Sequence, residues 1–414
     1  MNFKFAAALA LLATLSVGGP ARAEDTIKIA YIDPLSGPGA TVGEVGLKVF
    51  RFLADEINAK GGAAGKMFEI LPFDSKTNPQ ESLVQVQKAV DAGARIITQG
   101  NGSAVAGALS DWVSKYNERN PGKEVLFLNY AAVDPALTND KCSFYHFRWD
   151  ANSDIKMEAL TNYMKGQDKI KKVYLINQDY SFGQAVRAAA NSMLKAKRPD
   201  IQIVGDELVP LLKITDFSPY IAKIKASGAD SVITGNWSQD FALLLKAAAD
   251  AGLQVDWFTY YAGLTGGPVA VRQTNLNHRV FAIMAGEANI DNAASRATET
   301  AFRAKYDIAI QIPQIFSEMR MLAAAITKAG APADAIKIAG ALEGMDTQVF
   351  NGGKGMMRKD DHQFFQPMYI ASFGERTASE PFDEEKTGWG WRAVIKIDGD
   401  KTILPTTCKM TRPN

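Results

Sequence analysis

Metal-binding and redox side chains are scarce in this sequence. Its 414 residues include two cysteines and three histidines, and none of them shows a ligand spacing such as C-x-x-C or H-x-x-x-H. We therefore predict no metal and no cofactor. An excess of one charge is also missing, because 46 Lys and Arg residues face 45 Asp and Glu residues. The basic residues alternate with acids along presumed helix faces, which argues against a nucleic-acid partner.

Motifs of catalysis are absent as well. Neither G-x-S-x-G nor G-x-x-x-x-G-K-S/T occurs. The glycine loop "PLSGPGATVG" at 34–43 has Val42 where a dinucleotide fingerprint needs its third glycine, so it is a weak nucleotide signal. We predict that the protein is not an enzyme. An exported α/β enzyme stays open as an alternative, with catalytic groups near His362 or a triad assembled in space.

No segment beyond the N-terminus offers the roughly 18 unbroken apolar residues that span a bilayer. The N-terminus has Lys4, an apolar stretch over 5–17 and the sequence Ala21-Arg22-Ala23, which is the pattern of a secretory signal peptide cleaved after Ala23. We expect export to an oxidising compartment. That compartment favours one disulfide between Cys142 and Cys408 over two free thiols.

Short apolar and β-branched runs alternate with helical patterns along the chain. The runs are "TIKIAYID", "FEILPFD", "ARIITQG", "EVLFLNY", "KVYLINQ", "IQIVGDELV", "DSVITGN", "DWFTYYAG" and "RVFAIMAG". Such alternation predicts an α/β fold whose parallel sheets are covered by helices on both faces.

Helix and turn signals place some of the elements between and after these strands. Leu47, Phe50, Leu53 and Ile57 form the apolar stripe of one helix, closed by Gly61-Gly62. A second helix is expected over 316–328, closed by Gly330 and Pro332. Near the C-terminus, a strand over 393–397, an Asp398-Gly399 turn and a return strand are expected.

One pattern occurs twice. "GARIITQGNGSAVAGALSD" and "GADSVITGNWSQDFALLLKAA" both read Gly-Ala, an apolar strand, and Gly-Asn-x-Ser opening a helix. About one βα unit later each copy reaches a strand ending in Tyr-Ala, near Tyr130 and Tyr261. The repeat indicates two similar lobes, with chance likeness between βα units as the alternative. Ligands bind beyond the carboxyl ends of parallel strands, so these loops are expected to line one cleft.

Several side chains in these loops suit recognition of a small molecule. Ser103 and Ser238 stand at predicted helix N-termini, where hydroxyl and amide groups accept a carboxylate. Tyr180, Trp237 and Tyr261 add aromatic surface for a flat or apolar ligand. Taken singly, each has a plainer explanation as a helix cap or as loop packing.

With these residues identified, the sequence resembles the periplasmic solute-binding proteins of branched-chain amino acid ABC transporters, the Leu/Ile/Val-binding protein family. The resemblance covers about 26–372 and is carried by "IAYIDPLSGPGATVGEVG", "NYAAVDPALT", "QDYSFG" and "AITKAGAP". It implies the type I periplasmic-binding fold, in which two Rossmann-like lobes are joined by a three-stranded hinge. The signal peptide would be 1–23, lobe one 24–148 and 290–346, and lobe two 149–289 and 347–414 with a strand-rich extension. The tail would return to the hinge, bringing Cys408 to Cys142.

The resemblance also implies a ligand set. Family members hold a ligand carboxylate with a serine and amides that match Ser103 and its neighbours. The hydroxyl that usually follows Ala131 and Ala132 is replaced by Val133, and the acid that pairs with an ammonium falls at or beside Ala262. Both departures favour an anion over a zwitterion, unless Asp150 or Glu318 supplies the acid. The expected ligand-binding residues are Asn101, Gly102, Ser103, Ala131, Ala132, Val133, Tyr180, Trp237, Tyr261, Ala262 and Phe316.

The function implied is a periplasmic receptor of an ABC importer, expected to be a monomer that delivers its ligand to an inner-membrane permease. The ligand would be a small carboxylate with an apolar or aromatic body, as in the aromatic-acid-binding branch of the family. A branched-chain amino acid or amide is the alternative ligand. A sensory ligand-binding role is the alternative function within the same fold.

Overall fold

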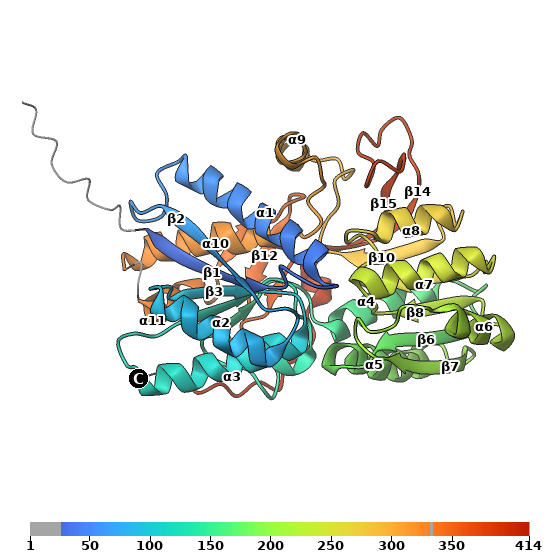
Figure 1. The fold of residues 1–414 in the computed structure, drawn as a ribbon, viewed down its shortest axis with the longest axis horizontal. Coiled ribbons are helices and arrows are strands. Elements are labelled where there is room, and N and C mark those ends of the chain that lie inside the picture. Colours follow the sequence, from blue (N-terminus) through green and yellow to red (C-terminus); the bar gives the residue numbers. More distant parts are fainter. Residues whose placement is uncertain (1–25, 332–333, 414) are drawn as a thin grey trace, which may run out of the picture.

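Two α/β lobes lie side by side in a computed structural model that describes residues 26–331 and 334–413 (Figure 1). The expected signal peptide with its cleavage site after Ala23, and Pro332, lie outside these residues. None of the helices in the described ranges combines the length and the apolar character that a membrane crossing requires.

The first lobe is built on a five-stranded, fully parallel sheet with the order β2-β1-β3-β4-β5. Its strands are β1 (Ile27–Asp33), β2 (Phe68–Asp74), β3 (Ile96–Gln99), β4 (Leu126–Asn129) and β5 (His146–Arg148). The helices α2 (Pro79–Asp91) and α3 (Ser103–Arg119) pack together, as do α1 (Ala40–Asn58), α10 (Gln314–Ala329) and α11 (Ala335–Leu342). The expected apolar stripe lies within α1, and Gly330 ends α10 with a φ of 62°. Both helices therefore begin and end close to the expected positions.

The second lobe repeats the strand order of the first. Its sheet runs β15-β14-β10-β9-β8-β6-β7, and β6 to β10 are parallel to one another. The parallel strands are β6 (Lys172–Gln178), β7 (Gln202–Val209), β8 (Ser231–Thr234), β9 (Asp256–Thr259) and β10 (Val280–Met284). Its helices are α4 (Ser153–Lys165), α5 (Ser181–Lys197), α6 (Ser218–Ser227), α7 (Ser238–Asp250) and α8 (Gly267–Gln273). The expected two-lobed α/β fold is confirmed, and the repeated motif corresponds to β3–α3 and β8–α7.

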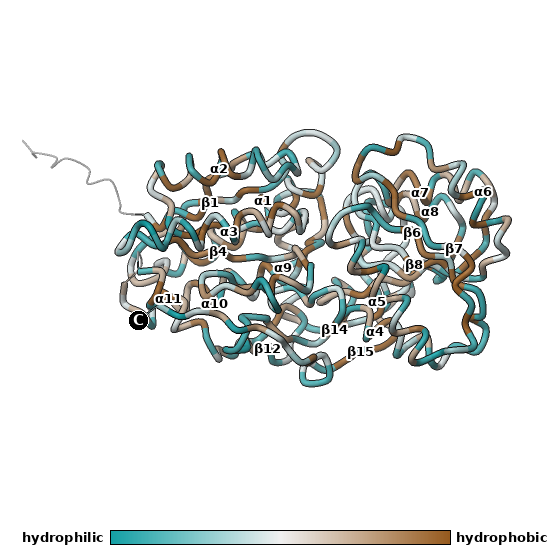
Figure 2. Tube along the Cα trace, turned by 90° about the horizontal axis from the view of Figure 1, so that it is seen from below, coloured by the Kyte–Doolittle hydropathy of each residue, from teal (hydrophilic) through white to brown (hydrophobic). Residues whose placement is uncertain are grey.

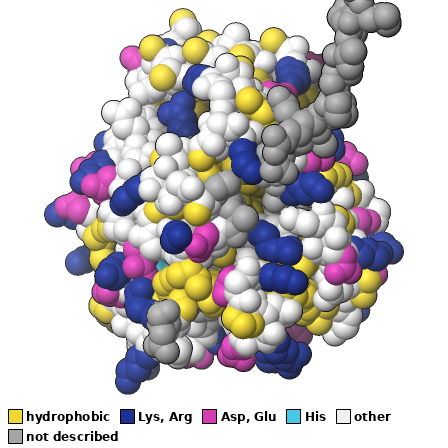
Figure 3. Space-filling view, turned by 90° about the vertical axis from the view of Figure 1, so that its left-hand side faces the viewer, with side chains coloured by type: hydrophobic (Ala, Val, Ile, Leu, Met, Phe, Trp, Pro, Cys, Tyr) yellow, Lys and Arg dark blue, Asp and Glu magenta, His cyan; other side chains and the backbone are white. Residues whose placement is uncertain are grey.

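Hydrophobic stretches run through the interior of both lobes (Figure 2), as expected for sheets covered by helices. The face shown in Figure 3 carries Lys and Arg side chains interspersed with Asp and Glu. The apolar residues thus form a core in each lobe, and the functional question moves to the space between the lobes.

The segments after α8 divide between the lobes differently from the expectation. The sequence placed 347–414 with lobe two. The strands β14 (Met368–Glu375) and β15 (Trp389–Ile397) do join the second sheet, where they run antiparallel to their neighbours. The chain before β14, however, contacts lobe one, because the Arg148 amide of β5 donates to the His362 carbonyl at 2.9 Å. Between β10 and β14 the chain also forms α9 (Ala293–Tyr306), β11 (Asp346–Gln348), β12 (Lys354–Met357) and β13 (Phe364–Phe365). Short strands carry no sequence signal of which sheet they will pair with.

The expected hairpin at Asp398-Gly399 is wrong. β15 instead pairs with the preceding strand β14, and a 3-10 turn, η2 (Gly399–Thr402), follows Asp398. The described tail after η2 contains no strand, because its polar groups bond to the first lobe: the Thr406 hydroxyl donates to the Thr138 carbonyl at 2.7 Å. The expected disulfide between Cys142 and Cys408 is confirmed.

Candidate ligand-binding cleft

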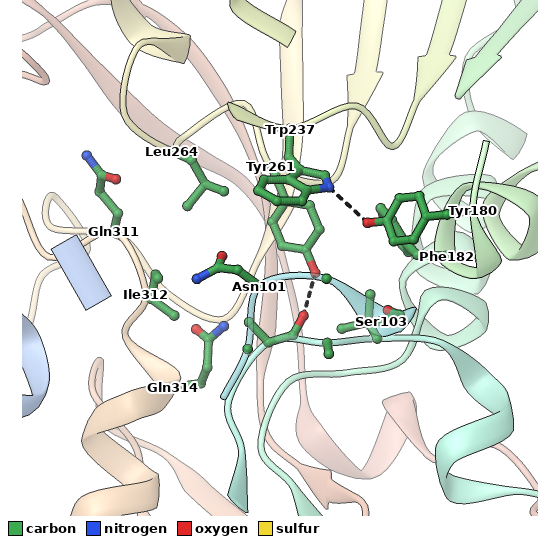
Figure 4. Close-up of a pocket in the computed structure, with 15 residues that line it drawn as sticks. Asn101, Ser103, Tyr180, Phe182, Trp237, Tyr261, Leu264, Gln311, Ile312 and Gln314 are labelled. Carbon is green, nitrogen blue, oxygen red and sulfur yellow. Dashed lines mark hydrogen bonds between the residues drawn. The ribbon is translucent and has the colours of Figure 1, made fainter. Parts of the chain in front are cut away.

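A cavity lies between the lobes at the carboxyl ends of their strands. It offers about 440 Å³ of space between protein atoms, counting the part open to solvent. Loops after β3 and β4 line it from the first lobe, and loops after β6, β8 and β9 line it from the second (Figure 4). The segment before α10 closes one side. This is the position at which open α/β sheets bind their ligands.

The structure brings nine of the expected ligand-binding residues together around this cavity. They are Asn101, Gly102, Ser103, Ala131, Ala132, Val133, Tyr180, Trp237 and Tyr261. Ala262 does not line the cavity, because it points into the core of the second lobe. Phe316 does not line it either, since its ring packs edge-on against Phe350 and lies 3.7 Å from the Arg320 guanidinium. Their expected place in the cleft is therefore corrected.

Six further residues line the cavity and were not expected from the sequence: Gly100, Phe182, Leu264, Gln311, Ile312 and Gln314. Gly100, Phe182 and Leu264 lie within three residues of expected positions, so the sequence motifs identified the correct loops without naming these residues. The stretch from Gln311 to Gln314 has no counterpart in the repeated pattern, and its sequence carries no signal of a binding loop.

The first turn of α3 forms the polar end of the cavity. Its first amide groups have no acceptor within the helix, and a helix N-terminus attracts negative charge. The residue before it, Gly102, has a φ of 99°, which a side chain would disfavour. The Ser103 hydroxyl oxygen accepts a hydrogen bond from the Asp134 amide at 3.2 Å, so its own proton is left to donate. This end of the cleft is suited to a carboxylate.

A buried carboxylate fixes the loop that leads into α3. The Asn101 amide donates to Asp33 Oδ1 at 2.9 Å, the Gly100 amide donates to Asp33 Oδ2 at 3.1 Å, and the Tyr130 hydroxyl donates to Asp33 Oδ2 at 2.6 Å. Burial raises the pKa of Asp33 to about 7, although these hydrogen bonds oppose the shift. Asp33 does not line the cavity and acts as support for the loop.

Glu318, one of the two acids considered as an ammonium partner, is also engaged elsewhere. It is fully buried, and its Oε1 accepts the Thr98 hydroxyl at 2.7 Å. Burial raises the pKa of Glu318 to about 8. Its Oε2 has no hydrogen-bond partner among the described residues, and Glu318 does not line the cavity.

Aromatic side chains form the second-lobe wall. The Trp237 indole donates to the Tyr180 hydroxyl at 2.9 Å, which fixes both rings (Figure 4). The Phe182 ring lies 5.9 Å from the Tyr180 ring and 5.8 Å from the Tyr261 ring, centroid to centroid. Burial raises the pKa of the Tyr180 hydroxyl, so it stays neutral. The wall offers a flat, largely apolar surface.

Hydrogen bonds hold the two lobes together across the cleft. The Ser238 hydroxyl donates to the Pro38 carbonyl at 3.0 Å, and Gln311 Oε1 accepts from the amide and the hydroxyl of Thr265, each at 2.9 Å. The glycine loop that contains Pro38 is thus the rim of the cleft. A Cβ at Gly43 would lie 1.8 Å from the Pro34 carbonyl oxygen, so this glycine serves the close packing of loop and helix.

Ionic side chains are missing from the cavity wall. Among the described residues that line it, none is Asp, Glu, Lys, Arg or His. Asp150, the other acid considered as an ammonium partner, lies behind Tyr261 and is 2.7 Å from the Lys156 ammonium, and both side chains are 3% exposed. An ammonium in the cavity would therefore meet no carboxylate that lacks a counter-charge.

Two α/β lobes with a cavity between them at the carboxyl ends of their parallel strands have the architecture of a bilobal solute-binding fold. The chain belongs to the periplasmic binding protein family, whose pattern matches residues 26–378.

Individual relatives support the assignment to this family. Leu/Ile/Val-binding protein homolog 4 of Brucella abortus (strain 2308) is 35% identical over 412 residues, which is 97% of each chain. The closed structure of a leucine-, isoleucine-, valine-, threonine- and alanine-binding protein from Brucella ovis is 32% identical, with a TM-score of 0.82 over 94% of this chain and 100% of that one. A solute-binding protein from Rhodopseudomonas palustris HaA2 in complex with p-hydroxybenzoic acid shares the fold at 19% identity, with a TM-score of 0.76 over 91% and 98% of the two chains.

Proposed function

We propose that this protein is the periplasmic receptor of an ABC importer and that it captures a small carboxylate with an apolar or aromatic body. One observation carries the choice of ligand: the cleft combines the N-terminus of α3 and the Ser103 hydroxyl with a wall that has no ionic side chain in the described residues. We further propose that the mature chain begins at Glu24 and acts as a monomer.

The electrostatics of the cleft favour an anion over a zwitterion. A carboxylate at the start of α3 gains hydrogen bonds from amides and a hydroxyl, and the helix dipole adds to them. An α-ammonium group would lose its hydration without gaining a counter-charge, at a cost of roughly several kcal/mol. The aromatic wall of Tyr180, Phe182 and Trp237 then suits a ring or another apolar body.

Binding proceeds by closure of the lobes, without turnover. The ligand first contacts the α3 end in an open form, and the second lobe then closes over it. The closed form is favoured because the ligand gains contacts with both lobes at once. Ser238 and Gln311, which already bridge the lobes, add ligand-independent contacts to that form. The permease would recognise the closed surface.

A branched-chain amino acid is the second candidate ligand, and the names of the two Brucella relatives favour it. Such a ligand would require the ammonium to be held by backbone carbonyls and by side-chain amides or hydroxyls. The p-hydroxybenzoic acid complex of the Rhodopseudomonas protein favours the aromatic acid.

A thermal-shift screen of benzoates, phenylpropanoates, aliphatic acids, leucine and valine separates these candidates. A ligand at 100 times its dissociation constant adds about 2.7 kcal/mol of stability, which raises the melting temperature clearly. We expect an aromatic or aliphatic acid to give the largest shift. A larger shift with leucine than with any simple acid would transfer the assignment to the second candidate. Consumption of a stabilising compound during incubation would indicate an enzyme instead.

A further inference from the structure

A second cavity adjoins the first behind Tyr261. It offers about 350 Å³ between protein atoms, and its wall includes Lys156, Asp150 and Met284. Four side chains line both cavities: Tyr261, Leu264, Gln311 and Gln314. In Figure 4, Ser103 lies at one side of the first cavity, and Gln311 and Gln314 lie at the other. The second cavity is thus reached from the end of the cleft that is remote from the carboxylate position.

The buried pair of Lys156 and Asp150 gives this cavity a polar end with no net charge. Asp150 Oδ2 accepts from the Lys156 ammonium at 2.7 Å and from the Tyr261 hydroxyl at 3.3 Å, while Asp150 Oδ1 receives no hydrogen bond from any described residue. The Lys156 ammonium has three donors, and beyond Asp150 its other hydrogen-bond contact is the Tyr261 hydroxyl at 3.5 Å. One donor and one acceptor of the pair are therefore left for a ligand.

Gln314 supplies a second polar group at the shared wall. It is 6% exposed, and its amide makes no hydrogen bond within the described part of the chain. Figure 4 shows this amide directed toward the cavity. Gln311 is different, because its Oε1 is occupied by Thr265 and only its Nε2 is left. Gln314 is not among the residues with a buried polar atom that lacks a partner, so its amide is accessible from the cavity and is free to bind a ligand.

We propose that the second cavity is a distal subsite, which receives a hydroxyl group at the end of the ligand opposite its carboxylate. This inference rests on the proposed function. A hydroxyl has one donor and two acceptor sites, so it can donate to Asp150 Oδ1 while it accepts from the Lys156 ammonium and from Gln314 Nε2. A second carboxylate there would face Asp150, and an ammonium would face Lys156. The substrate class is therefore a hydroxylated monocarboxylic acid.

Isothermal titration calorimetry with matched acids tests the subsite. Benzoate and phenylpropanoate are each compared with their para-hydroxy derivatives. For at least one of the two lengths, we expect the hydroxylated acid to bind the native protein about ten-fold more tightly, the effect of one buried hydrogen bond of about 1.4 kcal/mol. Equal affinities within both pairs would overturn the distal subsite while leaving the proposed function in place. If none of the four acids binds, the distal subsite and the aromatic form of the proposed ligand are both refuted, and the proposed function is then limited to aliphatic acids.

Gln314→Met supplies the matched variant, because methionine has a similar length and no amide. Because Gln314 also lines the main cavity, the affinities of both acids can change in this variant, but the preference for the hydroxylated acid should be lost, so that the two acids of a pair bind equally. Ser103→Ala should weaken both acids of a pair equally. An equal loss for both acids in Gln314→Met would show that Gln314 has only a structural role and would contradict the proposal.

A double variant, Lys156→Met with Asp150→Leu, tests the other side of the subsite. It removes the pair as a unit, so no uncompensated charge stays buried. We expect the double variant to bind unsubstituted acid and to show a reduced preference for the hydroxyl. A full preference in both this variant and Gln314→Met would place the hydroxyl elsewhere and would refute the assignment.

Discussion

The Tyr261 hydroxyl of the second lobe lies 3.2 Å from the carbonyl oxygen of Ala131 in the first lobe. The same hydroxyl lies 3.3 Å from Asp150 Oδ2. A phenol has one proton, so it can donate to only one of these acceptors at a time. The contact between the two lobes, from Tyr261 to Ala131, therefore competes with the contact from Tyr261 to the buried ion pair of Lys156 and Asp150.

Replacement of Tyr261 by phenylalanine removes this contact and keeps the aromatic ring. We expect the free energy of ligand binding to weaken by about 1 kcal/mol, the usual net value of one hydrogen bond, which corresponds to roughly a five-fold higher dissociation constant. Calorimetry measures the affinity, and small-angle scattering without ligand should show a more open average shape. Tyr163→Phe is the matched control, since no hydrogen bond involves the Tyr163 hydroxyl in the described structure. An unchanged affinity in Tyr261→Phe would mean that the Ala131 contact does not stabilise the closed form.

The serines at the starts of α3 and α7 should differ in their effects, although the sequence places them alike. Ser103→Ala removes a free donor at the carboxylate end, so benzoate should lose roughly 1–3 kcal/mol of binding free energy, as for a hydrogen bond to a charged group. Ser238→Ala removes a lobe-to-lobe bond to Pro38 and should cost about 1 kcal/mol or less for every ligand. Calorimetry with benzoate and the neutral benzamide distinguishes the two. If Ser103→Ala weakened the binding of benzoate and benzamide by a similar amount, Ser103 would act only by accepting the hydrogen bond of the Asp134 amide, and not by binding a carboxylate.

Much of this architecture was readable from the sequence because parallel strands leave continuous apolar runs. All nine expected runs are strands, and the repeated Gly-Asn-x-Ser motif led directly to Ser103 and Trp237 in the cleft. Side-chain direction was harder to predict. Tyr261 faces the cavity, so the adjacent Ala262 points into the core, a difference of one residue that sequence likeness does not resolve. Gln311 and Gln314 were missed because their approach to the cleft depends on how α10 docks against the first lobe.

The buried Glu318 should make stability depend on pH. Its pKa is about 8 in the folded protein, above its ordinary value near 4.5, so the folded state holds a proton that the unfolded state has released. Between about pH 4.5 and pH 8 the unfolding free energy therefore falls as pH rises, by up to about 1.4 kcal/mol per pH unit. Glu318→Gln cannot titrate, so its unfolding free energy should not show this fall. The unfolding free energy of the variant minus that of the native chain should therefore be larger at pH 8 than at pH 5. Urea unfolding at pH 5 and at pH 8 measures these free energies, and Glu44→Gln, at an exposed position, is the control. The same difference in both variants would contradict a role for Glu318.

The disulfide between Cys142 and Cys408 joins residues 266 positions apart and should contribute substantially to stability. Closing so long a loop restricts the unfolded chain, and a native disulfide is typically worth about 2–4 kcal/mol. Cys142→Ser with Cys408→Ser should lower the unfolding free energy by that amount, and denaturant titration measures it. A reducing agent should destabilise the native protein and leave the double variant unaffected. Equal sensitivity of the two proteins would show that the reductant acts on something other than this bond.

The position of that covalent link also determines what a protease can separate. The chain between β14 and β15 is exposed from Glu375 to Ser379, and a trypsin cut after Arg376 would divide the polypeptide into two fragments. The smaller fragment would carry β15 and Cys408, and the larger one Cys142. The cut protein would therefore run as a single band on a non-reducing gel and as two bands after reduction, and a strand at the edge of one lobe would stay attached through its anchor on the other.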